Sequence, residues 1–155
     1  MNGILCLVKL LIALRFNYMK ILFIGNGNAS KRHQYCLKQL LPSISLTIAT
    51  SNPLNSKAIR FANMDSDKIM SHDAVFVCGA ASTRFEELST LMPLDIPIFL
   101  EKPMLCQRYS GRSIRYLLDK RSSNALVAVG YNMHYIKGIT DLLQDHFSGS
   151  FGRVT

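Results

Sequence analysis

Short apolar runs alternate along the chain with segments whose apolar residues recur at helical spacing. The apolar runs predict five β-strands, at residues 20–25, 45–50, 74–78, 97–100 and 125–130. The helical spacing predicts α-helices at residues 29–41, 83–92, 110–121 and 134–147, with one or two weaker helical turns between 55 and 63. Strands that alternate with helices in this way favour a doubly wound α/β fold, with a mostly parallel sheet and helices on both faces.

Length and composition agree with one such domain. The chain has 155 residues, of which 48% are hydrophobic and 18% charged. This composition excludes a disordered, collagen-like or disulfide-scaffold protein. The net charge of +8 is uneven, because residues 1–64 hold eight Lys and Arg and no acid, whereas residues 65–155 sum to zero. The first 64 residues are therefore suited to an anionic partner.

The two ends of the chain lie outside this pattern. Residues 3–16 form an apolar run that Lys9 interrupts, shorter than the roughly 20 residues that span a bilayer. Three interpretations of residues 1–18 stay open: an upstream extension of the reading frame, an added amphipathic helix, or a poor membrane anchor. The domain is then expected over residues 19–150. A further strand pattern starts at 153–155, so residues 151–155 are expected to be the first residues of a missing C-terminal domain.

The cysteines indicate a reducing compartment. They are spread along the chain without a C-x-x-C pair, at Cys6, Cys36, Cys78 and Cys106. Free thiols in the cytoplasm are the expectation, and no metal site is predicted, since a zinc site needs four clustered ligands.

A glycine-rich loop joins the first predicted strand to the first predicted helix. Residues 25–30 (GNGNAS) follow G-x-G-x-x-S, close to the G-x-G-x-x-G/A fingerprint of Rossmann-type dinucleotide-binding domains. Gly25 would allow the tight turn, Gly27 would let a pyrophosphate approach, and the helix N-terminus would offer it free N–H groups. The predicted cofactor contacts here are Gly25, Gly27, Asn28, Ala29 and Ser30. A glycine-rich turn without a ligand is the alternative.

The end of the second strand bears on the choice of cofactor. An NAD-binding domain normally has an acid there, whereas this chain has Ser51 between Thr50 and Asn52. The missing carboxylate argues against a methyltransferase-type site and favours NADP over NAD, with Ser51 as a contact. Lys57 and Arg60 follow shortly, either as partners of a 2′-phosphate or as a solvated face.

Five segments, in chain order, carry motifs of one known family. They are GNGNASKRH at 25–33, DAVFVCGAAS at 73–82, EKP at 101–103, GYN at 130–132 and GRV at 152–154. Together they resemble the Gfo/Idh/MocA-type oxidoreductases, which include glucose–fructose oxidoreductase and inositol dehydrogenase. The resemblance runs over residues 19–155. The chain departs from the family pattern at Gly79-Ala80, where Thr-Pro is usual, at Arg84, where His is frequent, and at His134, where sugar-acting members often have Arg.

The resemblance implies an NAD(P)-binding domain, followed in the family by a second domain that covers the nicotinamide and carries a catalytic His. It implies that Lys102 is the catalytic residue of this chain, aimed at substrate or nicotinamide by a commonly cis Pro103. Lys102 also lies at the carboxyl end of a central strand, where open α/β sheets bind ligands; an ion pair with a neighbouring acid is the alternative. His33 is as readily structural as functional. Further cofactor contacts are implied at Gly79, Ala80, Glu101, Lys102, Pro103 and Asn132.

The predicted function is hydride transfer at a hydroxyl or carbonyl of a sugar, nucleotide-sugar or cyclitol. This chain alone is expected to bind the dinucleotide with little or no turnover. The alternative is a stand-alone nucleotide-binding module, or a subunit completed by a separate chain. A nucleic-acid partner is not expected, because basic and aromatic residues do not interleave as a stacking groove requires. No membrane partner is expected, and the oligomeric state is left open.

Overall fold

The computed structural model describes residues 18–50, 59–131 and 141. These fall almost wholly within one compact unit, Phe16–Gly130. Except for Asp141, the predicted helix at 134–147 lies outside the described residues, as do the predicted strand start at 153–155 and residues 1–17. No helix among the described residues combines the length and the apolar character that crossing a membrane requires.

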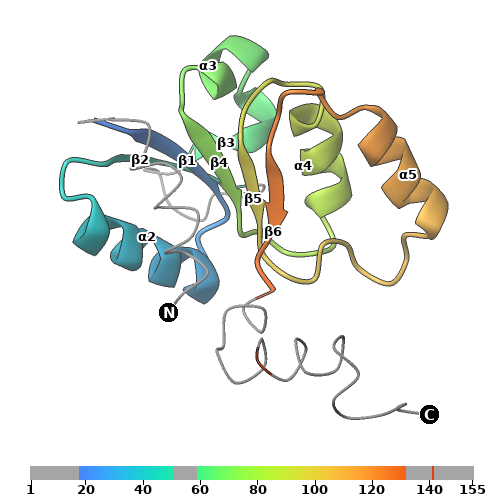
Figure 1. Ribbon diagram of the computed structural model, residues 1–155, viewed down its shortest axis with the longest axis horizontal. Helices are drawn as coiled ribbons and strands as arrows, with labels where there is room; N and C mark the ends of the chain where they lie inside the picture. The colour runs from blue at the N-terminus through green and yellow to red at the C-terminus, as the bar shows by residue number, and fades with distance from the viewer. Residues whose placement is uncertain (1–17, 51–58, 132–140, 142–155) are drawn as a thin grey trace. The chain divides into compact units, whose positions relative to one another are not determined.

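Six parallel strands form a single sheet in the order β3-β2-β1-β4-β5-β6 (Figure 1). The strands are β1 (Lys20–Ile24), β2 (Ser45–Thr50), β3 (Ile59–Arg60), β4 (Ala74–Val77), β5 (Ile98–Leu100) and β6 (Val127–Val129). The helices are α2 (Asn28–Leu40), the 3-10 helix η1 (Phe61–Asn63), α3 (Ser66–Met70), α4 (Arg84–Leu91) and α5 (Gly111–Asp119). Strand order reverses at β1, which pairs with both β2 and β4. This is the Rossmann-type doubly wound topology, so the predicted fold class is confirmed.

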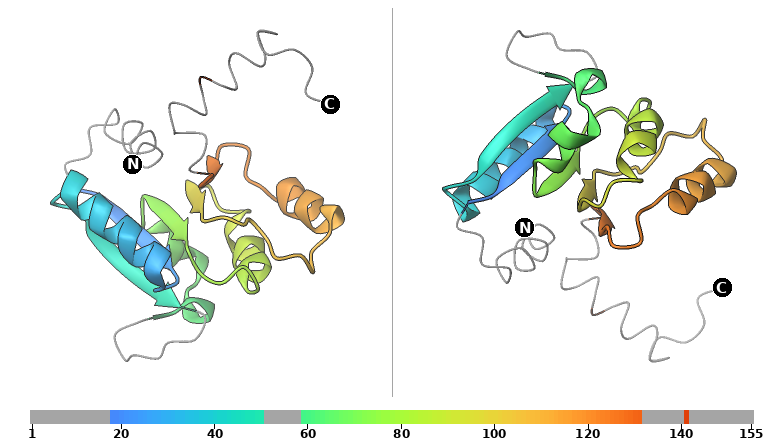
Figure 2. Two further views of the ribbon diagram at one scale, coloured as in Figure 1. Left: turned by 90° about the horizontal axis from the view of Figure 1, so that it is seen from below. Right: turned by 90° about the horizontal axis from the view of Figure 1, so that it is seen from above.

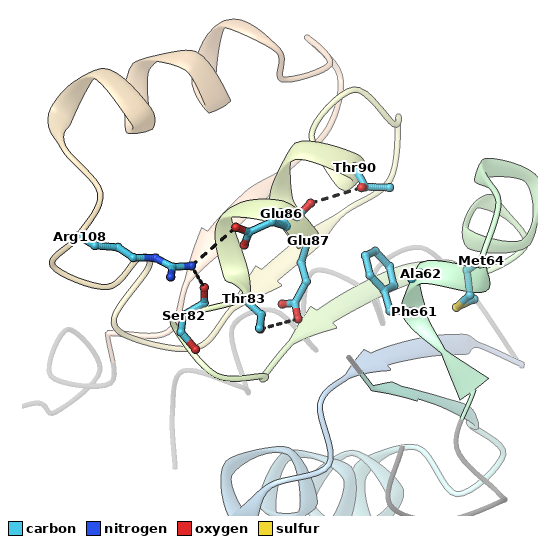
Figure 3. A pocket seen from close by; sticks show the side chains of 9 residues that line it. All are labelled: Phe61, Ala62, Met64, Ser82, Thr83, Glu86, Glu87, Thr90 and Arg108. Carbon is cyan, nitrogen blue, oxygen red and sulfur yellow. Dashed lines mark hydrogen bonds and ion pairs between the residues drawn. The ribbon is translucent and has the colours of Figure 1, made fainter. Parts of the chain in front are cut away.

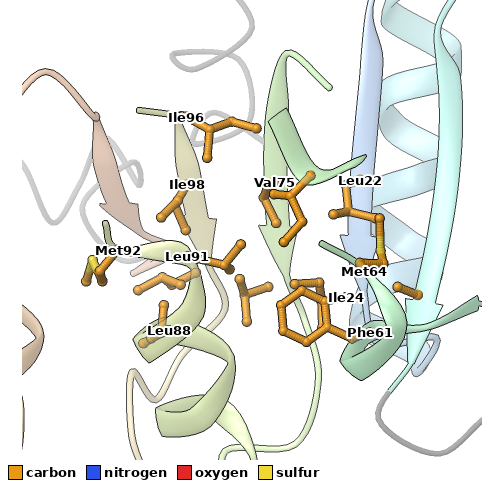
Figure 4. Packing of buried hydrophobic residues seen from close by; sticks show 14 of the residues in the cluster. Leu22, Ile24, Phe61, Met64, Val75, Leu88, Leu91, Met92, Ile96 and Ile98 are labelled. Atoms are coloured by element: carbon orange, nitrogen blue, oxygen red, sulfur yellow. The ribbon is translucent and has the colours of Figure 1, made fainter. Parts of the chain in front are cut away.

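Helices cover both faces of the sheet, as the views in Figure 2 show for α2 on one side and α4 and α5 on the other. On the α4 side, Leu22 and Ile24 of β1 belong to a buried cluster to which η1, α4 and α5 contribute (Figure 4). On the α2 side, Phe23, Phe76 and Phe99 stand in register on three adjacent strands. Their neighbouring rings lie 4.9 and 4.8 Å apart, centroid to centroid. These three rings, called the aromatic row below, line the face of the sheet that α2 covers.

The structure corrects the prediction for residues 55–63. Ile59 and Arg60 form the edge strand β3, and among the described residues of this range the helical turn is confined to Phe61–Asn63. Both strand residues are exposed, and among the described residues they pair with the end of β2. A strand of two exposed residues has no alternation of apolar and polar positions that would predict it. Helix α3 is an element that the helical spacing did not predict. It has five residues and is capped by Asp65, whose Oδ1 accepts a hydrogen bond from the Lys68 N–H at 2.8 Å.

Candidate functional site

The loop between β1 and α2 lies at the carboxyl edge of the sheet, where the strand order reverses. Gly25 has φ +100°, and a Cβ added there would lie 2.6 Å from the backbone N and Cα of Gly79. Its own N–H donates to the Ala49 carbonyl of β2 at 2.7 Å. Both the left-handed backbone and the close approach of Gly79 therefore require glycine at position 25, as the sequence predicts for a tight turn.

Gly27, by contrast, faces open space. It is the N-cap of α2, with extended backbone (φ −77°, ψ −177°), and a Cβ added there would have no atom within 4 Å. As a glycine it supplies no side-chain cap, and the first turn of α2 contains no acid. Asn28, Lys31 and Arg32 are exposed around it. This helix N-terminus thus combines the positive end of the dipole, two cations and unfilled space, which suits an anion.

Ser30, which replaces the third glycine of the fingerprint, is fully buried. Its Oγ accepts a hydrogen bond from Gln34 Nε2 at 2.8 Å, one turn along α2. A small side chain whose hydroxyl is satisfied inside the helix lets α2 lie close to the sheet. The departure from glycine is therefore accommodated in the structure.

The loop between β4 and α4 approaches the glycine-rich loop from the other side of the reversal point. Gly79 is half-buried and Ala80 exposed. Thr83 Oγ1 donates to Glu87 Oε1 at 3.0 Å, which ties the end of this loop to α4. Burial raises the pKa of the Cys78 thiol to about 12, so this cysteine is a neutral core residue and not a nucleophile.

The EKP segment follows β5 at the same edge. Glu101 is buried, with Oε1 lying 2.5 Å from His33 Nε2 of α2 and Oε2 accepting the backbone N–H of Lys102 at 3.1 Å. The ring of His33 packs against those of Phe99 and Phe76, at 5.3 and 6.0 Å between centroids. The Lys102–Pro103 bond is cis, and the Lys102 side chain is exposed. Both carboxylate oxygens of Glu101 are therefore engaged within the protein, beneath an accessible Lys102.

Arg84, the first residue of α4, is buried against these loops with only 2% of its surface exposed. Its guanidinium donates to the carbonyls of Gly79 and Glu101, each at 2.5 Å, and to that of Pro103. Burial lowers the pKa of the guanidinium, and the nearby Glu87 opposes that shift. The sequence identified Arg84 only as a departure from the family pattern. That departure was the one sequence feature that could have indicated its role.

A pocket of about 390 Å³ lies between η1 and the first half of α4 (Figure 3). Arg108 stands at one end, donating to the Ser82 carbonyl and lying 3.7 Å from Glu86 Oε1. Apolar groups gather at the opposite end. The lining residues are Phe61, Ala62, Met64, Ser82, Thr83, Glu86, Glu87, Thr90 and Arg108. Sequence reasoning missed this pocket, because its walls come from segments far apart in the chain.

The structure brings most of the predicted site residues to one edge of the sheet. The segments 25–30, 79–80 and 101–103 follow β1, β4 and β5, three neighbouring strands that run in the same direction. Ser51 and Asn132 lie outside the described residues. Within residues 18–50, 59–131 and 141, no group of three or more His, Cys, Asp or Glu side chains is arranged to hold a metal ion.

No protein-family model matches the chain, and no curated protein matches it. Solved structures do. A Gfo/Idh/MocA family oxidoreductase from Vibrio cholerae is 21% identical with a TM-score of 0.60, covering 82% of this chain and 43% of that one. The myo-inositol dehydrogenase from Lactobacillus casei, solved in complex with NAD(H) and myo-inositol, is 20% identical with a TM-score of 0.67, covering 85% of this chain and 42% of that one.

The scyllo-inositol dehydrogenase from Lactobacillus casei is 18% identical with a TM-score of 0.68, covering 89% of this chain and 44% of that one. The chain thus spans less than half the length of each structure. Fold and loop arrangement define a Rossmann-type α/β domain. The resemblance to Gfo/Idh/MocA oxidoreductases is confirmed at the level of the fold.

Proposed function

We propose that this chain is the nicotinamide-dinucleotide-binding part of a Gfo/Idh/MocA-type oxidoreductase. The observation that carries the proposal is the convergence of the open α2 N-terminus and the cis Lys102–Pro103 turn at the edge where the strand order reverses. Ligands of open α/β sheets bind at such a point. The NAD(H) bound by the structurally similar myo-inositol dehydrogenase supports the same class of cofactor here.

The residues present fit a dinucleotide at three positions. A pyrophosphate would occupy the space above Gly27, where an added Cβ has no protein neighbour. The pocket between η1 and α4 offers Phe61 and Met64 to an adenine ring and the Glu86 carboxylate to its exocyclic amine. The buried Thr50 Oγ1 at the end of β2 has no hydrogen-bond partner among the described residues, at the place where a ribose is read. A preference for NADP over NAD as the cofactor is also part of the proposal.

Lys102 is the proposed catalytic residue. The bound nicotinamide would supply hydride chemistry, while the ammonium of Lys102 would donate a hydrogen bond or a proton to the reacting substrate oxygen. No salt bridge between described residues involves Lys102, which leaves its charge available to a ligand. The inositols named with the similar dehydrogenases support a sugar or cyclitol as substrate of the complete enzyme.

The proposal includes little or no turnover by this chain alone, because hydride transfer needs a closed site from which water is excluded. It also includes a cytoplasmic location, which the free thiols of Cys36, Cys78 and Cys106 support. The second candidate is a subunit completed by a separate chain.

Titration of the full chain with NADH and with NADPH, followed by nicotinamide fluorescence, tests the proposal. The variant Gly27→Val should abolish binding, because its side chain fills the space assigned to the pyrophosphate. Gly111→Val is the matched control: Gly111 also begins a helix, and a Cβ there also has no neighbour within 4 Å. Binding that survives in Gly27→Val, or no binding of either dinucleotide by the unmodified chain, would refute the site. Measurable dehydrogenation of myo-inositol by this chain alone would refute the low-turnover part.

A further inference from the structure

Arg84 connects two loops that a dinucleotide site needs in a fixed relation. One of its nitrogens donates to the Gly79 carbonyl in the loop after β4, and another to the carbonyls of Glu101 and Pro103 after β5. These strands are neighbours in the sheet, so both loops rise side by side from its carboxyl edge. Arg84 is thus the shared anchor of the loop next to the phosphate-binding turn and of the turn that carries Lys102.

This placement is costly, which argues against a merely space-filling role. The guanidinium is buried, and its printed hydrogen bonds all go to neutral carbonyls, although the nearby carboxylates of Glu87 and Glu101 offset part of the large penalty for removing a cation from water. It also stands at the first position of α4, where the helix dipole disfavours a cation. In return, the planar guanidinium fixes the directions of several hydrogen bonds at once, which a flexible ammonium cannot do.

The Lys102 turn is held from its other side by α2. There the Glu101 side chain lies 2.5 Å from His33 Nε2, while Arg84 holds the Glu101 backbone from α4. The exposed Lys102 side chain has no salt bridge among the described residues. Its direction therefore depends on the backbone of residues 101–103, and that backbone is held by buried partners on two helices.

We infer that Arg84 is a positioning residue, which holds the loops after β4 and β5 together so that Lys102 faces the nicotinamide half of the bound dinucleotide. The inference rests on the proposed function. It assigns Arg84 no contact with the ligand. Loss of its hydrogen bonds should therefore affect the nicotinamide half of the site and leave the adenosine half intact.

The test compares two probes, NADH and ADP-ribose, the latter having the adenosine and pyrophosphate but no nicotinamide. Arg84→Lys keeps a cation but cannot reproduce the planar set of three hydrogen bonds, so the inference is judged on this variant. Arg84→Met removes the hydrogen bonds altogether. Arg115→Met, at an exposed position of α5, is the control. Circular dichroism and thermal unfolding of each full-length variant establish that it is folded.

We expect Arg84→Lys to weaken NADH binding by about tenfold, because a displaced Lys102 ammonium would lose one charge-assisted hydrogen bond to the nicotinamide half. ADP-ribose binding should change by less than about twofold. Bound NADH should also protect Lys102 from acylation in the unmodified chain and fail to do so in Arg84→Lys, with the exposed Lys38 of α2 as internal reference in mass spectrometry.

The possible outcomes distinguish a failure of the positioning role of Arg84 from a failure of the proposed function. Equal weakening of NADH and ADP-ribose, or unchanged protection of Lys102, would overturn the positioning role while leaving the proposed function standing. Failure of the unmodified chain to bind either probe would overturn the proposed function and the positioning role with it. A selective loss of NADH affinity and of Lys102 protection in Arg84→Lys supports the inference.

Discussion

Substituting alanine for Gly25 should destabilise the fold even when no ligand is present. The new Cβ would lie 2.6 Å from Gly79 N and Cα and 2.9 Å from the Cys78 carbonyl carbon, all of them backbone atoms that cannot rotate away. Relieving such an overlap costs about 1–3 kcal/mol. A non-glycine residue at φ +100° adds about 1–2 kcal/mol. The sum is roughly 2–5 kcal/mol, which corresponds to a fall in Tm of roughly 4–20 °C for a chain of this size.

Thermal unfolding followed by circular dichroism measures this loss, with Gly27→Ala as the matched control two residues away. The backbone at Gly27 suits any residue and its surroundings are open, so the control should lose no more than about 1 kcal/mol, the cost of alanine at a helix N-cap. If both variants lose the same stability, or if Gly25→Ala loses none, then the close contact between the loops after β1 and β4 is not present in solution.

Three further outcomes follow from the packing and the local charges. Phe76→Ala removes the middle ring of the aromatic row and should cost about 3–5 kcal/mol in urea unfolding; a loss below 1 kcal/mol would contradict the packing. The hydrogen bond from the Lys68 backbone N–H lowers the pKa of the Asp65 carboxyl. The stability that this cap contributes is therefore present at neutral pH and lost as the pH falls through the lowered pKa. Asp65→Ala should flatten the acid limb of a curve of unfolding free energy against pH. The Cys78 thiol should resist alkylation at pH 8 under conditions that modify the half-buried Cys36, as peptide mass spectrometry can check.

The sequence allowed most of the sheet to be predicted, because its central strands are buried on both faces. The residues of β4, for example, are all buried, and a continuous apolar run is what such a strand requires. The two-residue edge strand β3 has exposed side chains and gives no such signal. Helix α3 is fixed by its Asp65 cap and one buried side chain, Ile69, which is too little for a helical period to be recognised.

The parts of the candidate site that depend on backbone position could be predicted from the sequence. The parts that depend on tertiary contacts between side chains could not. The convergence of the loops after β1, β4 and β5 follows from parallel strands, which all end at one edge. The contact between His33 and Glu101 joins residues 68 positions apart, and local patterning carries no information about it. Arg84 could be named from the sequence only as a departure from the family pattern, because nothing in its neighbourhood along the chain reveals that it donates to three carbonyls.

Burial divides the residues of the candidate site into exposed ones, proposed to meet a ligand, and buried ones, proposed to hold them in place. Gly27 and Lys102 are exposed at the carboxyl edge of the sheet, whereas Glu101 and Arg84 are buried and make hydrogen bonds within the protein. A flexible lysine can be aimed only through the backbone that carries it, so the geometry at Lys102 depends on these buried neighbours. Substitutions at the two kinds of position should therefore differ in kind: those at Gly27 or Lys102 should change ligand interactions directly, and those at Glu101 or Arg84 should change them by moving the turn.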